Sequence, residues 1–104
     1  MKRDELIEKI RQAVHEVELE PEIILYGSRS RGDAHSESDW DLLILVDGPI
    51  DDECIDGIRH RLYEIEWEYG EVISSIVRTR EEWNSALYQT MPFQQRVQQE
   101  GIRL

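Results

Sequence analysis

The chain has 104 residues and a formal net charge of −11, from 12 basic and 23 acidic side chains. This length predicts one domain, residues 1–104, around one hydrophobic core. The acidic excess repels phosphate backbones and anionic lipid, which argues against sequence-independent binding to nucleic acid or membrane. A single cysteine excludes an internal disulfide, and no run approaches the roughly 18 apolar residues of a membrane span, so we expect a cytoplasmic protein.

Apolar spacing divides the first two thirds of the chain into alternating helices and strands. Residues 4–17 carry apolar positions three and four apart, which is typical of an amphipathic helix. Short apolar runs at 23–26 and 39–46 predict two strands, and the second run is continuous enough to be covered on both faces. One apolar face from 51 to 69, followed by Gly70 as a stop signal, predicts a long helix.

The next segment predicts a third strand and a short helix. The strand covers residues 72–77. Thr79, with Glu82 three residues later, forms a capping-box signature. The signature predicts one short helix containing Trp83 and Leu87.

The last segment completes the order of elements. Pro92 opens a final helix that would end at Gly101, leaving residues 102–104 as an edge strand or a tail. Helices that alternate with short strands in this order pack on a small β-sheet. The sequence therefore predicts an α/β or α+β fold, a small sheet with helices packed on it.

The segment that follows the first predicted strand has the features of a phosphate-binding corner. Gly27 lacks a Cβ, so the backbone there can approach a ligand closely. Ser28 offers a hydroxyl and a backbone N–H at a predicted helix start, although an ordinary turn with Ser28 as the N-cap is the alternative. Arg29 and Arg31 add forked donors for phosphate oxygens in a chain where basic residues are scarce, and pairing with nearby acids is their alternative role.

Two aspartates begin the second predicted strand. Strand alternation sends the carboxylates of Asp39 and Asp41 to one face, about 6.5 Å apart along the backbone, and sends the Trp40 indole to the other. Such hard oxygen ligands suit Mg²⁺ that bridges substrate phosphates. A pair of surface acids on an edge strand is the alternative. The pattern favours a divalent metal site.

These two motifs together resemble a known family. Gly27-Ser28, ten intervening residues and Asp39-x-Asp41 are similar to the GS-x10-DxD signature of the polymerase-beta-type nucleotidyltransferases. The short length resembles their minimal nucleotidyltransferase (MNT) branch, so that residues 1–104 would form one such domain. The resemblance implies a mixed sheet, a triphosphate held by Gly27 and Ser28, and a metal bound by Asp39 and Asp41.

The resemblance also implies a partner and a reaction. Minimal domains of this type are commonly antitoxins paired with a HEPN-domain toxin, and some transfer AMP from ATP to a tyrosine hydroxyl of that toxin. The implied function is an Mg²⁺-dependent adenylyltransferase, with ATP as substrate and a HEPN toxin as partner. A small-molecule nucleotidyltransferase is an alternative from the wider family.

One departure from the family pattern concerns a third carboxylate. Active members often carry it on the strand after the long helix, where this chain has Ser74 and Ser75 at the strand's centre. Glu71, at the edge of that strand, is the candidate third carboxylate, and Glu66 and Glu68 are more remote choices. An antitoxin that neutralises its toxin by binding alone is therefore the second hypothesis.

Overall fold

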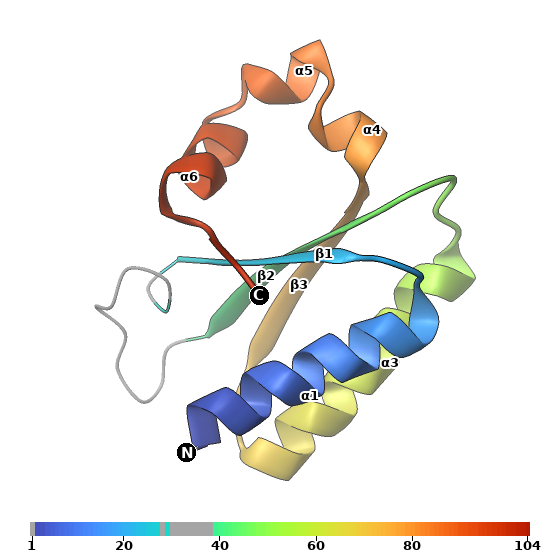
Figure 1. Ribbon diagram of the computed structural model, residues 1–104, viewed down its shortest axis with the longest axis vertical. Coiled ribbons are helices and arrows are strands. Elements are labelled where there is room, and N and C mark those ends of the chain that lie inside the picture. Colours follow the sequence, from blue (N-terminus) through green and yellow to red (C-terminus); the bar gives the residue numbers. More distant parts are fainter. Residues whose placement is uncertain (1, 28, 30–38) are drawn as a thin grey trace.

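The computed structural model describes residues 2–27, 29 and 39–104, which form one sheet between two layers of helices (Figure 1). One face carries two long helices, α1 (Lys2–Val17) and α3 (Asp52–Tyr69). The other face carries three shorter helices, α4 (Arg80–Trp83), α5 (Ala86–Gln89) and α6 (Pro92–Glu100). Within these ranges, no helix is both long and apolar enough to cross a membrane.

The sheet has four strands in the described residues, in the order β3-β2-β1-β4. The central pair, β1 (Glu22–Tyr26) and β2 (Trp40–Val46), is antiparallel. On one side β2 runs parallel to β3 (Ile73–Thr79), and α3 makes the crossover that a parallel pair requires. On the other side β4 (Ile102–Arg103) is antiparallel to β1. This mixed sheet with helices on it confirms the predicted fold class.

The side chains of β2 divide between two cores. Residues 42–46 are all buried, which confirms the prediction of a strand covered on both faces. The cluster against α1 and α3 receives Trp40, Leu42, Ile44 and Val46. The cluster against α4 and α6 receives Leu43 and Leu45. This alternation decides which face of the sheet each polar side chain at the ends of β2 meets.

The long helix α3 has a specific signal at each end. Asp51 is its N-cap, and the Asp51 Oδ1 accepts a hydrogen bond from the Cys54 N–H at 2.8 Å. Gly70 is its C-cap, with a left-handed φ of 67°. The observed helix therefore agrees with the predicted one over residues 51–69.

The segment after β3 corrects one prediction. The capping box of Thr79 and Glu82 is present, but the single short helix predicted there is two helices, α4 and α5. Ser85 lies between them, and its hydroxyl accepts a hydrogen bond from the Tyr88 N–H at 3.3 Å. A second local cap starts a new helix at Ala86. Leu87, in this second helix, is 70% exposed.

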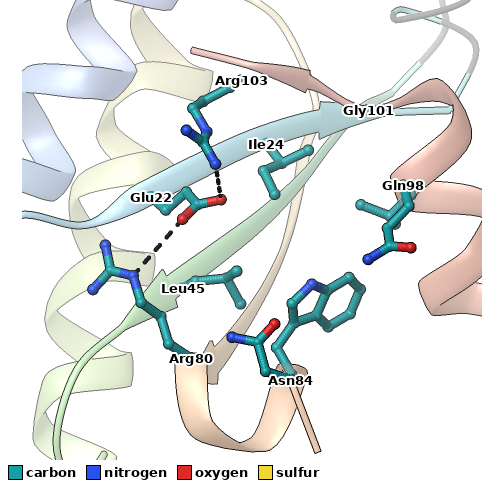
Figure 2. Close-up of a pocket in the computed structure, with 10 residues that line it drawn as sticks. Glu22, Ile24, Leu45, Arg80, Asn84, Gln98, Gly101 and Arg103 are labelled. Carbon is teal, nitrogen blue, oxygen red and sulfur yellow. Dashed lines mark hydrogen bonds and ion pairs between the residues drawn. The ribbon is translucent and has the colours of Figure 1, made fainter. Parts of the chain in front are cut away.

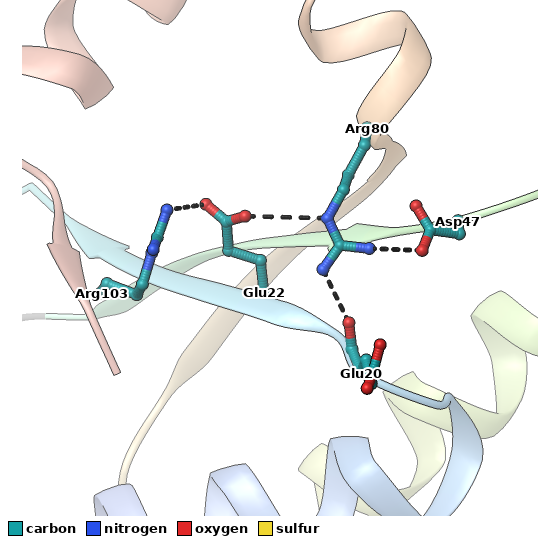
Figure 3. A network of polar contacts seen from close by, with 5 residues as sticks. All are labelled: Glu20, Glu22, Asp47, Arg80 and Arg103. Carbon is teal, nitrogen blue, oxygen red and sulfur yellow. Dashed lines mark hydrogen bonds and ion pairs between the residues drawn. The ribbon is translucent and has the colours of Figure 1, made fainter.

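A polar network ties the start of α4 to the sheet (Figure 3). The Arg80 Nη1 lies 2.9 Å from the Asp47 carboxylate, and the Arg80 Nη2 donates to the Glu20 carbonyl at 2.7 Å. Glu22 of β1 lies 3.7 Å from the Arg80 Nε and 2.9 Å from the Arg103 Nη2 of β4. Glu22 thus joins α4, β1 and β4 at the end of β1 that lies away from Gly27.

Candidate functional site

The end of β1 lies directly against the start of β2. Tyr26, the last residue of β1, pairs with Asp41. Gly27 follows with a left-handed φ of 77°, and a Cβ added there would lie 2.5 Å from the Asp41 Oδ2. No side chain fits at this position without moving the carboxylate. The glycine corner and the second aspartate therefore meet in space, although thirteen residues separate them in the sequence.

The two aspartates flank the buried indole of Trp40 at the start of β2. Asp39 precedes the strand and is exposed, whereas Asp41 is half-buried. Trp40 is 2% exposed and packs in the core against α1 and α3. Strand alternation then directs the Asp41 carboxylate to the opposite face.

The donor set at this end of β2 fits Mg²⁺. This ion is usually held by one or two carboxylates, with substrate phosphates and waters as its other ligands. Asp39 and Asp41 supply two such carboxylates. In the part of the chain that the structure describes, no group of three or more His, Cys, Asp or Glu side chains is placed to hold a metal.

Arg29 and Glu71 lie together beside Trp40. The Arg29 guanidinium carbon is 4.6 Å from the centroid of the indole, a cation–π distance. The Arg29 Nη2 is 3.5 Å from the Glu71 Oε2, and the Trp40 Nε1 donates to the same oxygen at 3.3 Å. The structure therefore places the candidate third carboxylate against an arginine and an indole.

The position beside Asp41 on the next strand carries a hydroxyl. Ser74 of β3 is the register partner of Asp41 in the parallel pair β2–β3. Neighbouring residues in register present their side chains on the same face of a sheet. The exposed Ser74 thus occupies the place from which a carboxylate on β3 would face the Asp41 side chain.

Tyr26 places a phenol next to the Asp41 carboxylate. Its ring makes an edge contact with Phe93 of α6, with centroids 5.3 Å apart. Burial raises the pKa of the Tyr26 hydroxyl, the negative charge of Asp41 raises it further, and Arg96 acts in the opposite direction. The phenol therefore stays neutral at physiological pH.

Glu100 is a residue at this corner that was not among the predicted site residues. Its Oε1 accepts a hydrogen bond from the Gly27 N–H at 3.2 Å. The two residues are 73 positions apart, and Glu100 is the last residue of α6. No local pattern signals such a contact, because it depends on how the C-terminal segment packs on β1.

Two predicted nucleotide-binding residues, Ser28 and Arg31, lie outside the described residues. Of the others, the structure brings Gly27 to Asp41 and directs Arg29 to Glu71.

A hollow of about 430 Å³ lies on the α4 and α6 side of the sheet (Figure 2). Its floor includes Ile24 and Leu45, and Arg80 and Arg103 stand at its polar side. Both guanidinium groups contact the Glu22 carboxylate, which offsets part of their charge. The hollow therefore carries less positive charge than its two arginines alone would give it.

Comparison with known proteins adds two findings. The chain matches the family model described as a nucleotidyltransferase domain over residues 7–97, a range that includes Gly27 and Asp41. It is also similar to a solved structure described as a toxin-antitoxin with AMP-PNP. That match has a TM-score of 0.64 and 18% identity and covers 92% of this chain and 69% of the other, so it shows likeness of fold. A search of curated proteins gave no significant match.

Proposed function

Because the chain belongs to the family of nucleotidyltransferase domains, we propose that it is an Mg²⁺-dependent nucleotidyltransferase of the antitoxin type. The reaction transfers AMP from ATP to a tyrosine hydroxyl of a cognate HEPN-domain toxin and so neutralises it. The observation that carries this proposal is the contact between Gly27 and the Asp41 carboxylate. The similarity to a toxin-antitoxin structure with AMP-PNP supports the choice of nucleotide and partner.

In this proposal the glycine corner binds the triphosphate. Gly27 and Ser28 donate backbone N–H groups, and the Ser28 hydroxyl adds a third donor. Arg29 and Arg31 supply guanidinium groups for the phosphate oxygens. Glu71 restrains Arg29 through the contact between their side chains, which limits the positions that the guanidinium can adopt.

The two aspartates hold the metal in this proposal. Mg²⁺ bound to Asp39 and Asp41 would neutralise charge on the phosphates. The packing of Asp41 against Gly27 fixes the carboxylate before substrate arrives, which lowers the cost of organising the site. The tyrosine oxygen of the toxin attacks the α-phosphorus in line. The bond from that phosphorus to the bridging oxygen breaks, pyrophosphate leaves, and the phenol proton passes to solvent.

The test follows AMP into the partner protein. A purified HEPN-domain toxin, the partner named in this proposal, is incubated with the chain and with ATP labelled at the α-phosphate. We expect Asp41→Asn to lower the labelling rate by about 100-fold or more. Asp56→Asn, an equal change on the exposed side of α3, should label at the wild-type rate. Labelling by Asp41→Asn at the wild-type rate would contradict the proposal.

A binding-only antitoxin is the second candidate, and Ser74 beside Asp41 is the observation that favours it. Without an acid at that position, the attacking hydroxyl has no carboxylate base on β3. The intact mass of toxin co-expressed with the chain and then separated from it distinguishes the two functions. A toxin that carries one adenylate indicates the transferase, whereas an unmodified toxin that regains activity on separation indicates binding alone.

A further inference from the structure

We propose that Glu100 sets the nucleotide affinity of the site by competing with the triphosphate for the Gly27 N–H. This inference rests on the proposed function of the Gly27 corner. The Glu100 carboxylate accepts the hydrogen bond that a phosphate oxygen would need there. Nucleotide binding therefore requires the Glu100 side chain to leave this position.

The end of α6 packs closely on β1, and this packing determines the position of Glu100. A Cβ added at Gly101 would lie 2.4 Å from the Val97 carbonyl oxygen and 2.7 Å from the Ile24 Cγ2. The Gly101 N–H also donates to the Val97 carbonyl at 2.7 Å. Glycine at this position allows the helix end to meet the strand directly, and Glu100 is the residue just before it.

The strand after α6, β4, also holds the end of α6 against β1, through backbone pairing. Arg103 pairs with Ile24, and Ile102 pairs with Leu25. The Leu104 N–H donates to the Ile23 carbonyl at 2.8 Å. Backbone pairing on one side and helix packing on the other hold the Glu100 backbone, so only its side chain has to move.

An anionic ligand that binds at Gly27 must displace the Glu100 carboxylate, and this displacement costs free energy. A carboxylate and a phosphate are both anions that accept hydrogen bonds from backbone N–H groups. Two carboxylates lie close to Gly27: the Glu100 Oε1 accepts from its N–H, and the Asp41 Oδ2 lies 2.5 Å from where a Cβ on this residue would be. A triphosphate at Gly27 must replace Glu100 at the N–H and also approach its negative charge.

The experiment measures binding of AMP-PNP with Mg²⁺ by calorimetry. Glu100→Gln keeps the length of the side chain and a carbonyl oxygen that can accept from Gly27, but removes the charge. We expect this variant to bind about three- to fivefold more tightly than the wild type. Glu100→Ala, which also frees the N–H, should bind at least as tightly as Glu100→Gln. High salt should reduce the difference from wild type.

A matched control and a stability measurement define the other outcomes. Glu81→Gln removes the same single negative charge at an exposed position of α4, and this variant should bind AMP-PNP like the wild type. Thermal unfolding should confirm that each variant is folded. If the wild type binds AMP-PNP and folded Glu100→Gln binds equally or more weakly, the role of Glu100 is overturned while the proposed function stands. If neither protein binds AMP-PNP, the proposed function fails and this inference fails with it.

Discussion

Gly27 is subject to two constraints, a left-handed backbone and the nearby Asp41 carboxylate. Gly27→Ala should lower the free energy of unfolding by about 1–2 kcal/mol for the backbone alone. A further loss of about 1–3 kcal/mol should follow from displacement of the carboxylate. Urea denaturation measures the total. Binding of AMP-PNP with Mg²⁺ should also be lost, because the displaced carboxylate would lie in the nucleotide site.

Gly48 is a control that separates these two constraints. Its φ is 75°, and a Cβ added there would meet nothing within 4 Å. Gly48→Ala should therefore lose only the backbone contribution and keep nucleotide binding. Equal losses of unfolding free energy in the two variants would show that the Asp41 contact at Gly27 has no energetic effect.

Cys54 is a thiol held in its neutral form. Three causes together raise its pKa from 9.0 to about 12: burial first, then Glu18, then the charge of Asp51. Glu18 acts both through its charge and through a hydrogen bond that it accepts from the thiol at 2.6 Å. We expect alkylation of Cys54 by iodoacetamide near about pH 8 to be at least about 100-fold slower than that of a free cysteine. Glu18→Gln should speed the reaction, whereas Glu5→Gln, at an exposed site on α1, should not. Equal rates for Glu18→Gln and the wild type would contradict a role for Glu18.

At the scale of elements, the packing of α6 on β1 depends on Gly101. Its φ of −67° suits any residue, so the cost of Gly101→Ala comes from contact alone. We expect a loss of about 1–3 kcal/mol in the free energy of unfolding, measured by urea denaturation. Gly57→Ala is the matched change, because a Cβ there would lie 3.5 Å from Val17, an ordinary contact, inside α3.

The Gly57→Ala variant should be more stable than the wild type by up to about 1 kcal/mol, because alanine favours the helix interior. Opposite signs for the two glycine variants are the expected result. If Gly101→Ala is as stable as the wild type, α6 and β4 can shift away from β1 at little cost. The placement of Glu100 would then lose its support.

The sequence predicted most elements because their signals are local. Apolar spacing and the stop at Gly70 predicted the long helix to within one residue of the observed Asp52–Tyr69. The third strand continues to Thr79, beyond the predicted residue 77, because pairing with β2 up to Val46 extends it. The split between α4 and α5 was not predicted. The spacing of the apolar residues favours one continuous helix, whereas Ser85 caps the start of a second one.

The candidate site was only partly predictable for the same reason. The spacing of Gly27 and Asp41 is a short-range pattern across two paired strands, and the structure has these residues in contact. The position of Glu71 depends on the indole of Trp40 and on Arg29, which come from other elements. Glu100 reaches Gly27 only after the C-terminal segment has paired with β1.

At the scale of the whole molecule, the net charge of −11 acts against the folded state. Several ion pairs of the described residues join side chains that are about half exposed, such as Arg11 with Glu8 and Arg61 with Glu16. Such pairs each contribute about 0–1 kcal/mol, so screening them costs little. Repulsion among the excess acids acts over longer distances than these ion pairs, so added salt screens the repulsion more effectively than it screens the pairs.

We therefore expect the thermal unfolding temperature to rise when salt is added. The screening length falls from about 30 Å at 0.01 M to about 8 Å at 0.15 M, which shortens repulsion between distant acids. Circular dichroism at several salt concentrations measures the effect. Replacing exposed acids, as in Glu81→Lys with Asp56→Lys, should weaken it by lowering the net charge. An unfolding temperature that falls with salt would instead mean that ion pairs, foremost the Arg80 network at the far end of β1, outweigh the repulsion.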